Sequence, residues 1–143
     1  MALDRLVVDA SVAAKWFLIT GIYAGEADAL LRNEWSLLVP DLIFPEVGNI
    51  VWKHVRKGTL PDAEAVNIVT TLGHLRLLVC PSYPLVTAAV EIACKTSRTV
   101  YDCLYLALAV QEGSAVVTAD EKLRNALLGT QYSRHILWIA DVV

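Results

Sequence analysis

The segment from Cys103 to Val110 constrains the fold most strongly, because it has the length of a helix and no charged position. Cys, Leu, Tyr, Ala and Val fill all of it. A helix that is apolar on every side must be covered on every side, which predicts the interior of a layered domain. One carboxylate, Asp102, stands at its start. A charge entering a buried helix costs several kcal/mol unless it is paired or bound to a metal ion.

Asp102 also has a simple structural interpretation. Together with Thr99 it matches a capping box, in which Thr99 caps the helix and an acid follows three residues later. An acid in the first turn also suits the helix dipole. The rest of the chain must decide between this role and a chemical one.

Short apolar runs alternate with helical segments along the chain. The expected strands are residues 6–9, 36–39, 77–80, 115–118 and 136–139. The expected helices are residues 11–18, 22–34, 41–57, 61–74, 84–96, 99–110 and 120–128. Ser11 and Asp41 are predicted to cap two of them. This alternation predicts one α/β domain over residues 1–143, a three-layer α/β/α sandwich with a mostly parallel five-stranded sheet.

Composition limits the partners and the compartment. With 12 basic and 15 acidic residues the net charge is −3, so no global positive field indicates nucleic acid. Hydrophobic residues make up 56% of the chain, yet no apolar run reaches the roughly 18 residues of a membrane helix. The surplus predicts a surface for a second copy or another protein. Cys80, Cys94 and Cys103 lack C-x-x-C spacing and predict core thiols in a reducing cytoplasm.

Four acids are expected at one edge of the predicted sheet. Asp9 ends the first strand and Asp120 follows the fourth. Glu46 and Asp102 lie near the starts of helices that begin at the same edge. Ligand sites in parallel sheets gather at the carboxyl ends of the strands. Each acid alone fits a turn or a cap, but four together, beside apolar runs, favour chemistry.

Carboxylates brought together repel one another, and a cation relieves that repulsion. Oxygen ligands without Cys or His favour Mg²⁺ or Mn²⁺, and such a site suits hydrolysis of a phosphodiester by a metal-activated water. We expect Asp9, Glu46 and Asp102 to hold the principal ion. Asp120 would hold a second ion or orient the attacking water. In-line attack would leave a 3′-hydroxyl and a 5′-phosphate.

The blocks around these acids resemble a known family. They are Val7-Val-Asp9-Ala-Ser11, Pro45-Glu46-Val47, Tyr101-Asp102-Cys-Leu-Tyr-Leu-Ala107 and Val117-Thr118-Ala-Asp120. In order and spacing they are similar to the signatures of PIN-domain ribonucleases, and most closely to the VapC toxins of prokaryotic toxin–antitoxin pairs. The resemblance implies that the four acids form a catalytic, metal-binding quartet. It implies Ser11 and Thr118 as polar neighbours in the pocket.

The resemblance also implies an endoribonuclease dependent on Mg²⁺ or Mn²⁺, a homodimer and inhibition by a cognate antitoxin protein. Since RNA needs positive charge near the pocket, Lys15 and Arg98 are candidate RNA contacts by their closeness in sequence to the acids. The apolar segment 50–72, which includes Trp52, is predicted to hold the antitoxin or a second subunit. The loop 19–22 departs from the family, whose members often carry proline and acids there.

Other functions fit parts of the pattern. A non-catalytic PIN-like module would bind RNA or a partner without cutting, and the complete quartet argues against it. A receiver-type phosphoacceptor domain shares the order of elements and an Mg²⁺ site. It needs paired acids after the first strand and an aspartate after the third, where this chain has Asp9 alone and Cys80-Pro-Ser82. A phosphoaspartate hydrolase needs D-x-D, and Asp9-Ala-Ser11 lacks the second acid.

Overall fold

The computed structural model describes residues 4–18 and 21–142, so Ile19 and Thr20 of the divergent loop lie outside the described residues. At its centre is a five-stranded sheet in the order β3-β2-β1-β4-β5, with every neighbouring pair parallel. The strands are β1 Arg5–Val8, β2 Ser36–Pro40, β3 Leu78–Cys80, β4 Val116–Thr118 and β5 Ile136–Trp138. The α/β prediction is confirmed. The order of strands reverses between β1 and β4, where ligand sites of parallel sheets form.

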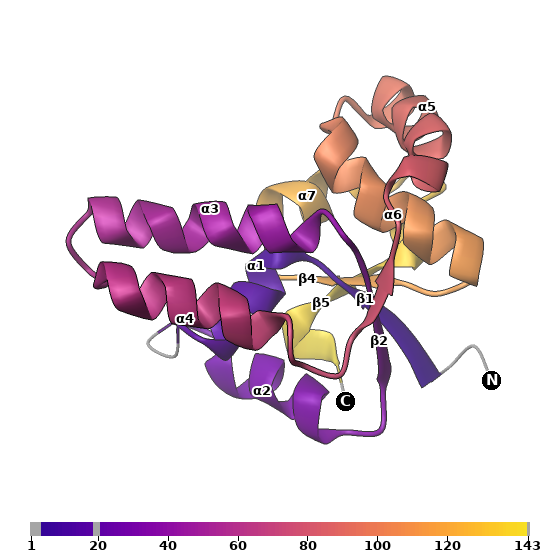
Figure 1. The fold of residues 1–143 in the computed structure, drawn as a ribbon. Coiled ribbons are helices and arrows are strands. Elements are labelled where there is room, and N and C mark those ends of the chain that lie inside the picture. The colour runs from indigo at the N-terminus through magenta and orange to yellow at the C-terminus, as the bar shows by residue number, and fades with distance from the viewer. Residues whose placement is uncertain (1–3, 19–20, 143) are drawn as a thin grey trace.

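Seven α-helices are described around this sheet: α1 Ala10–Ala13, α2 Ala24–Arg32, α3 Ile43–Arg56, α4 Asp62–Leu72, α5 Val86–Thr96, α6 Val100–Glu112 and α7 Glu121–Leu127. Short 3-10 turns are η2 Ala14–Trp16, η3 Tyr83–Leu85, η4 Ser133–His135 and η5 Ile139–Asp141. Helices α3 and α4 form a hairpin that projects from the sheet, while α5 and α6 pack together on the other side (Figure 1). No helix in the described ranges combines the length and apolar character needed to cross a membrane.

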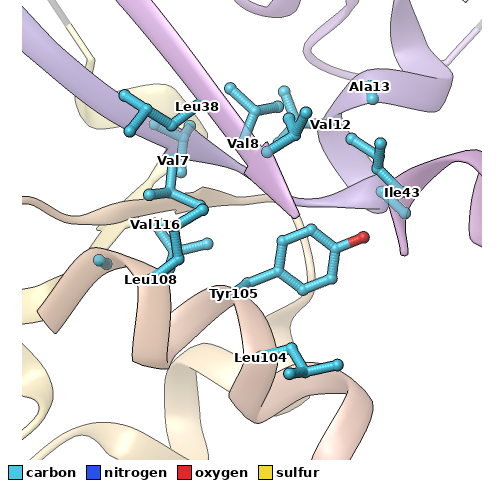
Figure 2. Packing of buried hydrophobic residues seen from close by; sticks show 14 of the residues in the cluster. Val7, Val8, Val12, Ala13, Leu38, Ile43, Leu104, Tyr105, Leu108 and Val116 are labelled. Atoms are coloured by element: carbon cyan, nitrogen blue, oxygen red, sulfur yellow. The ribbon is translucent and has the colours of Figure 1, made fainter. Parts of the chain in front are cut away.

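Helix α6 is the buried helix that the sequence predicts. Every residue from Cys103 to Ala109 is buried, and the helix packs on β1, β2 and β4. Figure 2 shows its side of the core, where Leu108 lies beside Val116. The Thr99 hydroxyl caps the helix by accepting a hydrogen bond from the Asp102 N–H at 3.1 Å. Burial of this helix fixes the position of Asp102 at the edge of the sheet where the strands have their carboxyl ends.

Two predicted caps are wrong. Helix α1 is capped by Asp9, whose Oδ1 accepts a hydrogen bond from the Val12 N–H at 3.2 Å, and Ser11 lies inside the first turn. Asp41 does not cap α3, because its carboxylate instead accepts hydrogen bonds from the N–H and the hydroxyl of Ser82. Tertiary contacts that tie the loops after β2 and β3 together thus override the local capping pattern.

The cysteine prediction holds for one residue of three. Cys103 is buried in α6, but Cys80 is half-buried and Cys94 is exposed on α5. All three thiols are free. The prediction of a core thiol is wrong for Cys94, because this residue lies on the solvent side of α5. The buried residues of α5 are Ala89 and Ile92.

Candidate active site

Asp9 occupies the carboxyl end of the central strand β1 and is only 6% exposed. Its Oδ1 accepts hydrogen bonds from the Ser11 hydroxyl at 2.6 Å and from the Val12 N–H at 3.2 Å. Burial raises the pKa of Asp9 to about 6, with hydrogen bonds from Ser11, Thr118 and Val12 opposing the rise and the charge of Asp120 adding to it. The charged form is therefore incompletely compensated by the protein, and a cation would stabilise it.

Two hydroxyls connect Asp9 to the end of β4. The Ser11 hydroxyl donates to Asp9 and accepts a hydrogen bond from the Ala119 N–H at 3.0 Å. Thr118 is fully buried, bonds to Asp9 and accepts a hydrogen bond from the Asp120 N–H at 3.0 Å. These contacts fix the ends of β1 and β4, and with them Asp9 and Asp120, relative to each other.

Asp120 caps α7, as one interpretation of the sequence predicts. Its Oδ1 accepts hydrogen bonds from the N–H groups of Lys122 at 2.9 Å and Leu123 at 3.3 Å. Both bonds end on the same oxygen. Capping and ligand binding therefore do not compete for the same atom, and a structural role does not exclude a chemical one.

Glu46 lies in the first turn of α3 and is partly buried. Its Oε1 accepts a hydrogen bond of 2.6 Å from the hydroxyl of Tyr105. Burial raises the pKa of Glu46; the hydrogen bond from Tyr105 opposes this and the charge of Asp102 adds to it. Burial and the charges of Glu46, Asp9 and Asp102 raise the pKa of Tyr105 far above its ordinary value, so Tyr105 stays a donor. Three of the four acids thus lie within electrostatic reach of one hydroxyl.

Asp102 is partly buried, and its Oδ2 accepts a hydrogen bond from Nη2 of Arg98 at 3.1 Å. The capping-box interpretation therefore holds for Thr99, which caps α6, whereas the carboxylate of Asp102 pairs with Arg98. The side chain of Arg98 is only 24% exposed. Its Nε is buried and has no hydrogen-bond partner among the described residues. The guanidinium thus keeps donor capacity that Asp102 does not use.

Lys15, the other residue predicted to contact RNA, lies in η2. Together with Ser11, Ile50 and His54 it lines an open cavity of about 290 Å³. Since the hydroxyl of Ser11 bonds to Asp9, this cavity opens directly beside the acidic site.

The four predicted acids repel one another in two pairs, Asp9 with Asp120 and Glu46 with Asp102, and charges from both pairs reach Tyr105. The side chains do not converge on a common point: within the described ranges no three His, Cys, Asp or Glu side chains are arranged to hold a metal ion. The donor set nevertheless fits a hard divalent cation, because it consists of carboxylate oxygens with raised pKa at Asp9 and Glu46.

Tyr105 is a site residue that sequence reasoning misses, since it assigns this tyrosine only to the apolar helix. A signal was present in the spacing. Tyr105 follows Asp102 by three residues, and residues three apart on a helix are neighbours on one face. This spacing predicts that the hydroxyl of Tyr105 lies on the same face of the helix as Asp102 and points toward the predicted acids.

The model of the PIN domain family matches residues 6–126, a range that includes all four acids. Ribonuclease VapC3 from Pyrobaculum aerophilum is 36% identical over 121 residues, which cover 83% of this chain and 92% of that protein. The crystal structure of PAE2754 from the same organism has a TM-score of 0.70 at 24% identity and covers 95% of this chain and 84% of its own. A toxin–antitoxin complex from Klebsiella pneumoniae has a TM-score of 0.65 at 14% identity, covering 96% and 99%.

The structural matches establish the fold, and the sequence matches establish the family. PIN ribonucleases generally use divalent metal ions, the class of ion that the donor set here fits. With the family model spanning most of its length and a relative more than one third identical, this chain belongs to the PIN-domain family, in the group of the VapC ribonucleases.

Proposed function

We propose that this protein, one PIN domain over residues 1–143, is a metal-dependent endoribonuclease and the toxin of a toxin–antitoxin pair. One observation carries the proposal: a buried Asp9 with a raised pKa ends the central strand beside the charge of Asp120, and the charges of Asp9, Glu46 and Asp102 all act on the hydroxyl of Tyr105. The similarity to a protein named Ribonuclease VapC3 supports RNA as the substrate. Family membership leaves no basis for a receiver-type phosphoacceptor domain.

The proposed roles follow from the contacts. Asp9, Glu46 and Asp102 would hold Mg²⁺ or Mn²⁺, which when bound supplies a Lewis acid and a water of lowered pKa. Ser11 and Thr118 keep Asp9 in place. Oδ1 of Asp120 is used by the cap, so its second oxygen would orient the attacking water or meet a second ion. The products would carry a 3′-hydroxyl and a 5′-phosphate.

The partner surface that we propose for the antitoxin lies in the helical hairpin. A groove of about 590 Å³ runs between α3 and α4, and all of its lining residues except Gly48 belong to the predicted segment 50–72. Trp52 and Val66 on its walls are 50% and 68% exposed, which is unusual for large apolar side chains. A solved toxin–antitoxin complex among the structures of the same fold supports such a partner. For a homodimer we propose the apolar edge of β3, where Leu78 and Val79 are about half exposed.

The direct test is incubation of the protein with mixed RNA in Mn²⁺, in Mg²⁺ and in EDTA. We expect fragments with 5′-phosphates in the presence of an ion, and loss of cleavage in EDTA that added Mn²⁺ restores. Fragment ends are read by ligation that requires a 5′-phosphate. RNA that is bound but never cut, with either ion, would instead establish the non-catalytic PIN-like module. Fragments that form equally well in EDTA would contradict metal dependence.

Arg98 and Lys15 are the proposed RNA contacts, and Arg98 gives the sharper prediction. Replacing Arg98 by Gln should raise KM for RNA by roughly tenfold and lower the slope of log affinity against log salt by about one, because one phosphate contact is lost. Cleavage kinetics between low and moderate salt measure both. Arg32→Gln is the matched control, because Arg32 also pairs with an aspartate four residues away, Asp28, but lies on the surface of α2. An unchanged KM and salt slope in Arg98→Gln would remove Arg98 from the substrate site.

A further inference from the structure

Tyr105 is a core residue with its polar end in the site. The side chain belongs to the buried face of α6, and the residue is 3% exposed. Figure 2 shows the ring beside the end of β1, with the hydroxyl directed away from Leu108 and toward Ile43 at the start of α3. At that point it donates to Glu46 at 2.6 Å, across 59 residues of sequence. The bond therefore joins the two helices that carry Glu46 and Asp102.

Core packing alone does not account for a tyrosine here. The other positions between Cys103 and Ala109 are Cys, Leu and Ala, and Phe would fill the same space as the ring without a hydroxyl to satisfy. A buried hydroxyl needs a partner, and in this chain the partner is a carboxylate of the proposed metal site. The bond also leaves Oε2 of Glu46 outside the contact, because only Oε1 takes part.

We propose that Tyr105 is the positioning residue of Glu46, an inference that rests on the proposed metal-dependent function. A glutamate has three side-chain torsions, and ordering them costs entropy at the moment an ion binds. A donor on a buried, rigid ring fixes Oε1 beforehand and so holds Oε2 ready for the ion. Hydrogen bonds of this kind to metal-ligating groups commonly contribute a factor of roughly 10 to 100 in metal affinity or activity.

The test is Tyr105→Phe in the full chain, with Mn²⁺ affinity measured by electron paramagnetic resonance of the unbound ion and cleavage measured alongside. We expect Mn²⁺ to bind roughly 10- to 100-fold more weakly and kcat/KM to fall by a similar factor. Tyr132→Phe, at another buried tyrosine that comes directly before η4, is the control and should change neither value. Circular dichroism checks that both variants are folded.

A double-mutant cycle with Glu46→Gln decides whether Tyr105 acts through Glu46. In the Glu46→Gln background, Tyr105→Phe should change Mn²⁺ affinity by less than about twofold, because the group that it positions is already gone. The same large loss in both backgrounds, or wild-type affinity in Tyr105→Phe alone, would overturn the inference and leave the proposed function intact. Wild-type protein that neither binds Mn²⁺ nor cuts RNA would overturn the proposed function and this inference together.

Discussion

Replacing Asp9 by Asn is expected to abolish RNA cleavage while making the metal-free protein more stable at neutral pH. Loss of a preorganised charge from an active site costs on the order of a thousandfold in rate. Asn has the same shape and keeps an oxygen that accepts from the Val12 N–H and the Ser11 hydroxyl, so the fold is preserved. A loss of activity with a gain in stability is the signature of a group kept for chemistry.

The size and pH dependence of the stability gain follow from the pKa of Asp9, which is about 6 in the folded protein against an ordinary 3.8. Well below pH 3.8 the carboxyl is protonated in both the folded and the unfolded chain and costs nothing. Between about pH 4 and pH 6 the unfolded chain ionises while the folded protein keeps the proton, so the folded protein loses stability, by about 3 kcal/mol once the pH is above 6. Asp9→Asn removes this loss, so its advantage should be small at pH 4.5 and largest near pH 8.

Urea unfolding in EDTA at these two pH values measures the advantage, and cleavage of RNA in Mn²⁺ measures the activity. Asp28→Asn, at an exposed acid of α2 that pairs with Arg32, should leave both unchanged. Full activity in Asp9→Asn would exclude Asp9 from the metal site. A variant less stable than wild type at pH 8 would show that hydrogen bonding, not burial of the charge, dominates the free energy of this residue.

The architecture could be predicted from sequence because burial leaves the chain few choices. The apolar run from Cys103 to Ala109 requires cover on all sides, and short strands that alternate with helices supply it. The positions of the acids followed from that topology, and the family from the blocks around them. Capping could not be predicted equally well. The carboxylate of Asp41 accepts a hydrogen bond from Ser82, a residue 41 positions away, and the local sequence carries no information on such a contact.

The pairing inside the site shows the same limit. Periodicity says which residues share a face of α6, and so could relate Asp102 and Tyr105 to each other. It does not say which side chain of α3 meets that face. The hydrogen bond between Tyr105 and Glu46 depends on how two helices cross the same sheet edge, and only the folded chain specifies it.

Asp102→Asn and Thr99→Ala are expected to separate chemistry from helix capping in α6. Asp102→Asn should lower cleavage on the order of a thousandfold, because it removes a proposed metal ligand. It should change the unfolding free energy by no more than about 1 kcal/mol, since the ion pair with Arg98 is still partly solvated and Asn keeps an oxygen that can accept from Arg98. Thr99→Ala should show the opposite pattern, a loss of about 1 kcal/mol in stability with cleavage per folded molecule retained.

Urea unfolding and cleavage rates, measured in parallel on both variants, give the comparison. The two residues are joined by a single hydrogen bond from the Asp102 N–H to the Thr99 hydroxyl, and Asp102→Asn leaves that bond in place. A difference between the variants therefore reports on the carboxylate alone. If Asp102→Asn cuts RNA normally and only Thr99→Ala has an effect, Asp102 is an acid of the helix terminus, and the buried helix carries no catalytic group at its start.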